Sequence, residues 1–369
     1  MPQADTPESF YLREEDLPAF AAGCAVLGTG GGGAVDTGFL TAVKAIQQHG
    51  PLEVRSINSF DDDDIIVPLS GVGAPTVSNE MVSSDDDAVL IGQEVERLMG
   101  RKPAAVMSSE IGGSNGISAV PWAASLGVPL VDADGMGRAF PEVQMVSMNV
   151  AGLEVNYIVL CDVVGNVSTL RPVDGPWSER LARALCVASG SGVLMADYIL
   201  NAAQARGAVI EGSVSHALRI GRCVQDAADP VAALIDLLGA ARLITGKIID
   251  IERHTGGGFV RGSVVVEGLG GDRGRMVRLE VQNENLIALE DGQVLASVPD
   301  LITVVDSQTA TAISTETLRY GQRVTILSWP CHPLWRTPRG LEIAGPRAFG
   351  YDITYVATEE IAHVASIPA

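Results

Sequence analysis

The chain has 369 residues, of which 47% are hydrophobic and 19% charged, and its formal net charge is −20. A hydrophobic share of this size supplies large cores, and the length favours two domains over one. The acidic balance excludes nucleic acid and anionic membrane as expected partners, because both repel a negative protein. A small-molecule substrate stays open, since a local arginine can still hold an anion.

The cysteines and the N-terminus indicate a compartment. Five cysteines are scattered without a CxxC pair, which is typical of reduced thiols in a cytosolic protein. The first residues are polar and acidic, unlike a secretory signal, and no apolar run approaches the length of a membrane span. We therefore expect a cytoplasmic protein.

The first notable motif is the glycine-rich loop Gly28–Gly33, between two predicted helices. Such a loop lets the backbone approach an anion, and it formally matches GxGxxG. The dinucleotide-binding motif needs a strand before the loop, whereas residues 17–27 have a helical pattern, so no NAD is expected. Two interpretations stay open. Gly30, Gly31 and Gly32 approach a substrate, or the loop is a hinge where two elements pack closely.

Strands and helices alternate in the next stretch. Apolar runs predict strands at 65–69, 103–108 and 128–131, with helices at 88–99 and about 117–126 between them. This order contains a βαβ unit, whose connection makes its strands parallel. We therefore predict an α/β protein whose N-terminal domain has a largely parallel sheet with flanking helices.

Carboxylates gather where these strands end. Glu110 follows the strand at 103–108, and Asp132 and Asp134 follow the run at 128–131. Parallel strands end at one edge of a sheet, where open α/β proteins bind ligands, so we predict that the three acids share a cleft with Gly28–Gly33. Converging carboxylates are costly unless they serve chemistry or bind a cation, although either aspartate alone could cap the following helix.

Arg138 and Glu142 are four residues apart directly after this motif, so on a helix they would share a face. An ion pair with Glu142 and a contact with a substrate carboxylate explain Arg138 equally well. The histidines show no zinc-type spacing. Glu110, Asp132 and Asp134 are suitable ligands for Mg²⁺ or Mn²⁺, so a divalent metal stays open and any other cofactor stays unknown.

The rest of the chain predicts strands at 144–150, 154–162 and 165–171, then helices at 178–205, 213–226 and 230–244. The turn-rich stretch 172–176 is a candidate domain boundary. Several strand patterns follow residue 246, so we predict a C-terminal domain of α+β or mainly β type. Within it, the polar run Gln282–Asn285 either binds substrate or closes a hairpin.

The segments that carry a family resemblance are Gly28–Gly33, Gly73–Pro75, Glu110–Gly113 with Asn115, Val131–Glu142, Gln282–Asn285, Val298–Ile302, Arg319–Gly321 and Gly345–Tyr351. Together they resemble the S-methyl-thiohydantoin desulfurase-like family, which is associated with hydantoinase and oxoprolinase proteins. The resemblance spans nearly the whole chain. It implies an N-terminal domain of residues 1–165, a C-terminal domain of residues 166–369, and action on a five-membered cyclic imide or thiohydantoin ring.

We accordingly predict a hydrolase in which water attacks a ring carbon of a hydantoin- or thiohydantoin-like cyclic amide, releasing a thiol or opening the ring. Glu110 or Asp132 would be the general base, and Asp134 would orient it or hold a cation. Predicted substrate-binding residues are Gly30, Gly31, Gly32, Gly73, Asn115 and Arg138. The alternative is a non-catalytic ligand-binding or regulatory subunit with a hydantoinase-type partner. A homo-oligomer also stays open.

Overall fold

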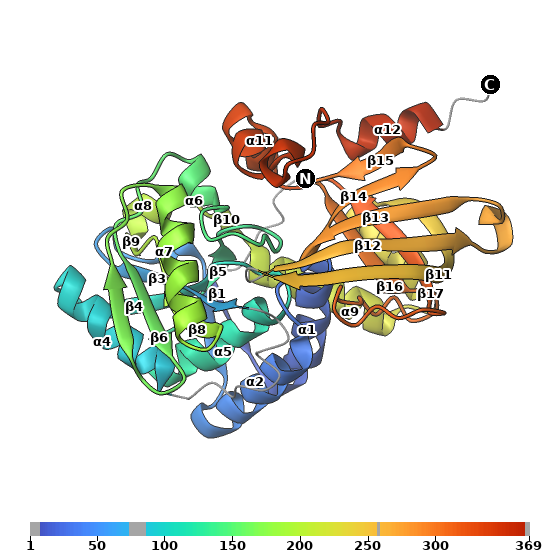
Figure 1. The fold of residues 1–369 in the computed structure, drawn as a ribbon. Helices are drawn as coiled ribbons and strands as arrows, with labels where there is room; N and C mark the ends of the chain where they lie inside the picture. Colours follow the sequence, from blue (N-terminus) through green and yellow to red (C-terminus); the bar gives the residue numbers. More distant parts are fainter. Residues whose placement is uncertain (1–7, 74–85, 257–258, 366–369) are drawn as a thin grey trace.

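The computed structural model describes residues 8–73, 86–256 and 259–365, which form two sheets with flanking helices (Figure 1). The first sheet has the order β1-β2-β5-β4-β3-β8-β6-β7, with β9 paired to β3 and β10 to β5. Its strands are β1 (Ser9–Leu12), β2 (Leu52–Arg55), β3 (Ile65–Gly73), β4 (Pro103–Ser108), β5 (Leu130–Asp134), β6 (Ile158–Asp162), β7 (Val167–Leu170), β8 (Gly192–Ala196), β9 (Leu200–Asn201) and β10 (Ile210–Glu211).

Helices flank the two sheets (Figure 1). They are α1 (Leu17–Leu27), α2 (Val35–His49), α4 (Asp87–Met99), α5 (Ser114–Leu126), α6 (Ser147–Val150), α7 (Gly175–Ala188), α8 (Ala202–Ala205), α9 (Ser213–Asp226), α10 (Pro230–Leu238), α11 (Pro338–Ala344) and α12 (Thr358–Ala365). Across the described ranges, none of them is long and apolar enough to cross a membrane.

The centre of the first sheet is parallel, as the alternating pattern predicted. β3 pairs with β4, β4 with β5 and β5 with β2, all in parallel, while the outer strands pair antiparallel. Helix α5 connects β4 to β5 and ends at Gly127, whose φ of 67° lets the chain turn back toward the sheet. The carboxyl ends of β3 and β4 therefore lie side by side.

The second sheet is antiparallel throughout its order β15-β14-β13-β12-β11-β17-β16. Its strands are β11 (Ala241–Gly256), β12 (Phe259–Gly268), β13 (Met276–Gln282), β14 (Glu284–Glu290), β15 (Gln293–Ser297), β16 (Leu301–Asp306) and β17 (Arg323–Trp329). The predicted fold class is thus confirmed: a two-domain α/β protein whose first sheet is mixed, with parallel strands and flanking helices, and whose C-terminal sheet is antiparallel.

Three predicted elements are wrong. The helix predicted at 230–244 ends at Leu238, and residues 241–244 belong to β11. Residues 144–150 form a turn and the short helix α6, not a strand. The helix predicted at 178–205 ends at Ala188, and the apolar run 192–196 is β8, paired between β3 and β6. Gly190 and Ser191, with φ of 88° and 70°, make the turn that separates them. Strands β8 to β10 pair in the first sheet, and the division at 165/166 stays a prediction.

Helix α1 packs between the two sheets. In Figure 1 it lies between them, and it packs against α2, α5 and α9. The Thr303 hydroxyl of β16 donates to the backbone oxygen of Val26 at 2.9 Å. The fully buried Trp335 belongs to the same core and donates its indole N–H to Met136 O at 2.8 Å. The segment after β5 is therefore held from both domains.

Candidate active site

A cavity of about 250 Å³ opens beside the carboxyl ends of β3 and β4. Both domains line it. The part of the molecule built on the first sheet contributes the loop after α1, the end of β3, the loop after β4, and β8, whereas the part built on the second sheet contributes Asn283 and Glu284 from the hairpin β13–β14. Of the residues predicted from sequence, Glu110, Asn115, Gly32 and Gly73 line this cavity.

Glu110 is the central acid of the cavity. Its Oε1 accepts a hydrogen bond from Asn115 Nδ2, while its Oε2 is buried without a partner among the described residues. Burial raises the pKa of Glu110 to about 8, and the hydrogen bond from Asn115 opposes part of that rise. A carboxyl that titrates near neutral pH is suited to proton transfer.

Asn115 positions Glu110 from the first turn of α5. Its Oδ1 accepts from Gly71 N at 2.7 Å, and its Nδ2 donates to Gly71 O at 3.2 Å. The end of β3 therefore fixes the amide that holds Glu110. Gly73, at the last residue of β3, lies so close to the carbonyl of Ser191 that a β-carbon would overlap it. Residues 74–75 of the same motif lie outside the described residues.

Two further buried acids reach the cavity from distant parts of the chain. Asp197, just after β8, is 1% exposed and has a pKa raised to about 7 by burial. Glu284 begins β14 and is also 1% exposed, and burial together with the Glu110 carboxyl raises its pKa well above the usual range. One oxygen of each has no partner within the described ranges. The polar run 282–285 thus closes a hairpin, with Asn283 at a φ of 56°, and also lines the cavity.

The loop Gly28–Gly33 is the junction between the domains. Thr29 O accepts from Asn285 N at 2.8 Å, and Gly30 O accepts from Thr315 N at 2.8 Å. At Gly31 a β-carbon would overlap the Glu284 carboxylate. Gly30 and Gly31 are not among the described residues that line the cavity, so the interpretation of the loop as a closely packed hinge accounts for them. Gly32 does line the cavity.

The two aspartates of β5 serve the backbone around the site. Asp132 accepts from the N–H and the hydroxyl of Ser215, at 2.9 and 2.5 Å, and so caps the first turn of α9. Asp134 Oδ2 accepts from the N–H groups of Ile111, Met136 and Gly137 at 2.7–3.0 Å. Neither aspartate is among the described residues that line the cavity. Asp134 is nevertheless near enough to Glu110 to contribute to the rise of its pKa, and the catalytic roles of both aspartates stay predictions.

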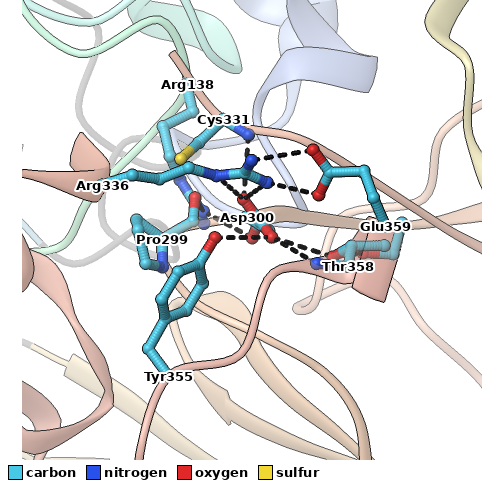
Figure 2. A network of polar contacts seen from close by, with 9 residues as sticks. Arg138, Pro299, Asp300, Cys331, Arg336, Tyr355, Thr358 and Glu359 are labelled. Carbon is cyan, nitrogen blue, oxygen red and sulfur yellow. Dashed lines mark hydrogen bonds and ion pairs between the residues drawn. The ribbon is translucent and has the colours of Figure 1, made fainter. Parts of the chain in front are cut away.

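Arg138 is fully buried. Figure 2 shows it beside Pro299 and Asp300. Its Nη1 donates to the carbonyls of Pro299 and Asp300 at 2.8 and 3.0 Å, and its Nη2 donates to Thr29 Oγ1 at 2.9 Å. The guanidinium also lies 4.4 Å from the centre of the Phe140 ring. Through these contacts Arg138 joins the two domains. It is not among the described residues that line the cavity.

The predicted helical pair of Arg138 with Glu142 is wrong, because residues 138–142 form no helix. Glu142 accepts from Gln144 Nε2 at 2.5 Å instead. In the described part of the chain, no three His, Cys, Asp or Glu side chains are grouped so as to hold a metal ion. The N–H groups of Gly113 and Ser114 bond to carbonyls of the protein, so they are not available to an oxyanion.

The carbonyls that bind Arg138 are themselves fixed by a network around Asp300 (Figure 2). The Asp300 carboxylate is fully buried and accepts from Cys331 N, Arg336, Tyr355 Oη and Thr358. These partners belong to the C-terminal segment after β17. The segment thus supports the contact between the domains that Arg138 makes.

The fold and the cavity define a two-domain α/β protein with a buried acidic site between its domains. Family models described as "S-Me-THD-like, N-terminal domain" and "S-Me-THD-like, C-terminal domain" match residues 15–172 and 173–358. The chain therefore belongs to this S-methyl-thiohydantoin desulfurase-like family, as its motifs predicted.

One solved structure is similar over nearly the full length. It is the crystal structure of a protein from Chromobacterium violaceum, with a TM-score of 0.76 and 24% identity, and the match covers 95% of this chain and 100% of that chain. At this identity the likeness shows the fold alone. No curated protein matches the chain.

Proposed function

We propose that the protein is a hydrolase of a five-membered cyclic amide of the hydantoin or thiohydantoin type, with Glu110 as its general base. The observation that carries the proposal is the Glu110 carboxyl itself. Glu110 lines the cavity, one of its carboxyl oxygens accepts a hydrogen bond from Asn115, the other is buried without a hydrogen-bond partner among the described residues, and the pKa of the carboxyl is raised to about 8. The family description supports the class of ring.

In the proposed reaction, the Glu110 carboxylate removes a proton from water as the water oxygen bonds to a ring carbon. A tetrahedral intermediate forms and then collapses. In an S-methylated ring the C–S bond breaks and methanethiol leaves, whereas in an unmodified hydantoin the C–N bond breaks and the ring opens. The leaving sulfur or nitrogen takes a proton from Glu284, and proton exchange between the two glutamates then restores the starting state.

Glu284 is suited to the acid role because burial and the nearby Glu110 carboxyl raise its pKa well above the usual range, which favours its protonated form. Its own domain brings it to the cavity beside Gly31, opposite the domain that carries Glu110. Two carboxyls whose surroundings give them different pKa values are the usual basis for a division into base and acid. Asn115 would keep the base oriented through the reaction.

The test is turnover of S-methyl-thiohydantoins and hydantoins by wild type, Glu110→Gln, and the control Glu211→Gln at an exposed site of β10. Mass spectrometry separates methanethiol release from ring opening. We expect Glu110→Gln to lower kcat by about 10²–10⁴-fold and the control to leave it unchanged. Full activity in Glu110→Gln would refute the base. Tight ring binding without any turnover by wild type would favour a ligand-binding subunit instead.

A further inference from the structure

The titratable side chains that line the cavity are almost all acidic. Its described acidic residues are Asp87, Glu110, Glu142, Asp197 and Glu284, against one basic residue, Arg183. The ranges outside the description, 1–7, 74–85, 257–258 and 366–369, contain neither lysine nor arginine in the sequence. Arg183 is therefore the one arginine or lysine in this cavity that could bind an anionic group of a ligand.

Arg183 is already engaged. Its Nε pairs with Glu179 Oε1 at 2.7 Å, and its Nη2 donates to Pro141 O at 3.1 Å. The guanidinium also lies 4.8 Å from the centre of the Phe259 ring. An anionic substituent would have to displace Glu179 or lose its hydration without compensation, and both are costly.

Asp197 offers the opposite kind of site. It is 1% exposed, its Oδ1 accepts one long hydrogen bond of 3.4 Å from Ser109 Oγ, and its Oδ2 has no partner among the described residues. A buried carboxyl with an open oxygen is unfavourable unless a ligand completes it. A cationic group from the ligand would do so, with a charge-assisted hydrogen bond.

We propose that the cavity takes a cyclic amide whose ring substituent ends in a cation, an ammonium or a guanidinium, and that Asp197 receives that cation. This rests on the proposed function for the ring, since Glu110 and Glu284 act on its reacting atoms. Asp197 lies on the loop after β8 and accepts from Ser109, the residue before Glu110, so the cation would bind next to the ring. A carboxylate substituent would meet no arginine or lysine in the cavity except the engaged Arg183, so substrates that carry one are disfavoured.

The test compares three hydantoins whose side chains are aminobutyl, pentyl and carboxybutyl, by titration calorimetry on the full chain. We expect the ammonium ligand to bind wild type about 10–100-fold more tightly than the pentyl ligand, as for a buried hydrogen bond to a charged group. The carboxylate ligand should bind most weakly. Equal affinities of the ammonium and pentyl ligands, or tightest binding by the carboxylate, would overturn the proposal.

Two variants locate the effect. Asp197→Asn should abolish the preference for ammonium over pentyl while changing the pentyl affinity by less than about threefold, because only the charge is removed. Asp250→Asn, the same change at an exposed residue of β11, should keep the preference. A preference that survives in Asp197→Asn contradicts the assignment. Should that variant not fold, as its melting curve would show, the wild-type ligand series decides alone.

The binding order is separable from catalysis. If the ligands bind in the expected order but no ring is turned over, the proposed hydrolase fails and the charge selectivity stands. If rings are turned over without regard to charge, the selectivity fails and the hydrolase stands. If no ring binds to wild type, both are wrong.

Discussion

The contact of Gly31 with Glu284 predicts a measurable coupling between the domains. In Gly31→Ala the new β-carbon would lie 2.5 Å from the Glu284 carboxyl carbon and 2.6 Å from its Cγ. The backbone at Gly31 is not left-handed, so the substitution adds overlap without conformational strain. Overpacking of this kind costs about 1–3 kcal/mol, and we expect the free energy of unfolding to fall by that amount.

Urea unfolding measures this cost, with Gly271→Ala as the matched control. A β-carbon at Gly271 meets no atom within 4 Å, so the control should change the unfolding free energy by less than about 1 kcal/mol. In a Glu284→Ala background the overlap disappears, and Gly31→Ala should then cost less than about 1 kcal/mol. An equal cost with and without the Glu284 side chain would refute the reasoning.

Three further predictions concern the groups around the site. Because burial raises the pKa of Glu110 to about 8 and of Asp197 to about 7, the folded protein binds more protons than the unfolded chain. Stability should therefore be greatest near pH 4 and fall from about pH 5 to about pH 8. Urea unfolding across this range tests it, and Glu110→Gln should flatten the slope; an unchanged slope would contradict the burial argument. Asn115→Ala removes a hydrogen bond that lowers the Glu110 pKa, so the pH profile of kcat/KM should move to higher pH; an unmoved profile would count against Asn115 as the orienting group. Arg138→Met should lower the unfolding free energy by about 3–5 kcal/mol, since it leaves buried acceptors unpaired, and a melting curve like that of wild type would contradict this role.

Local patterns predicted the parallel centre of the first sheet and Glu110 at its edge. The alternation of short apolar runs with helical patterns is sufficient for β3, β4 and β5, because each strand is buried and bounded by turn residues. Asn115 was predicted as a substrate-binding residue because it belongs, with Glu110–Gly113, to a motif of the family. These features depend on neighbours in the sequence, so the sequence expresses them directly.

Asp197 and Glu284 could not be assigned from the sequence in the same way. Asp197 reaches the cavity because β8 inserts between β3 and β6, and the small residues before it hid that strand within a helical pattern. Glu284 does so because the second domain packs its hairpin against Gly31. Only the polarity of Gln282–Asn285 hinted at this. For Asp132 and Asp134 the sequence left capping of the following helix open, but it did not show that Asp132 would cap the distant helix α9 or that Asp134 would bind the N–H of Ile111.

The most direct test of the central claim is the pH dependence of kcat/KM for the ring that wild type turns over fastest. If Glu110 is the base and its buried carboxyl has a pKa of about 8, kcat/KM should rise tenfold per pH unit below that value and level off above it. A profile that is already level from about pH 5, as for a carboxyl with its ordinary pKa, would contradict Glu110 as the buried base.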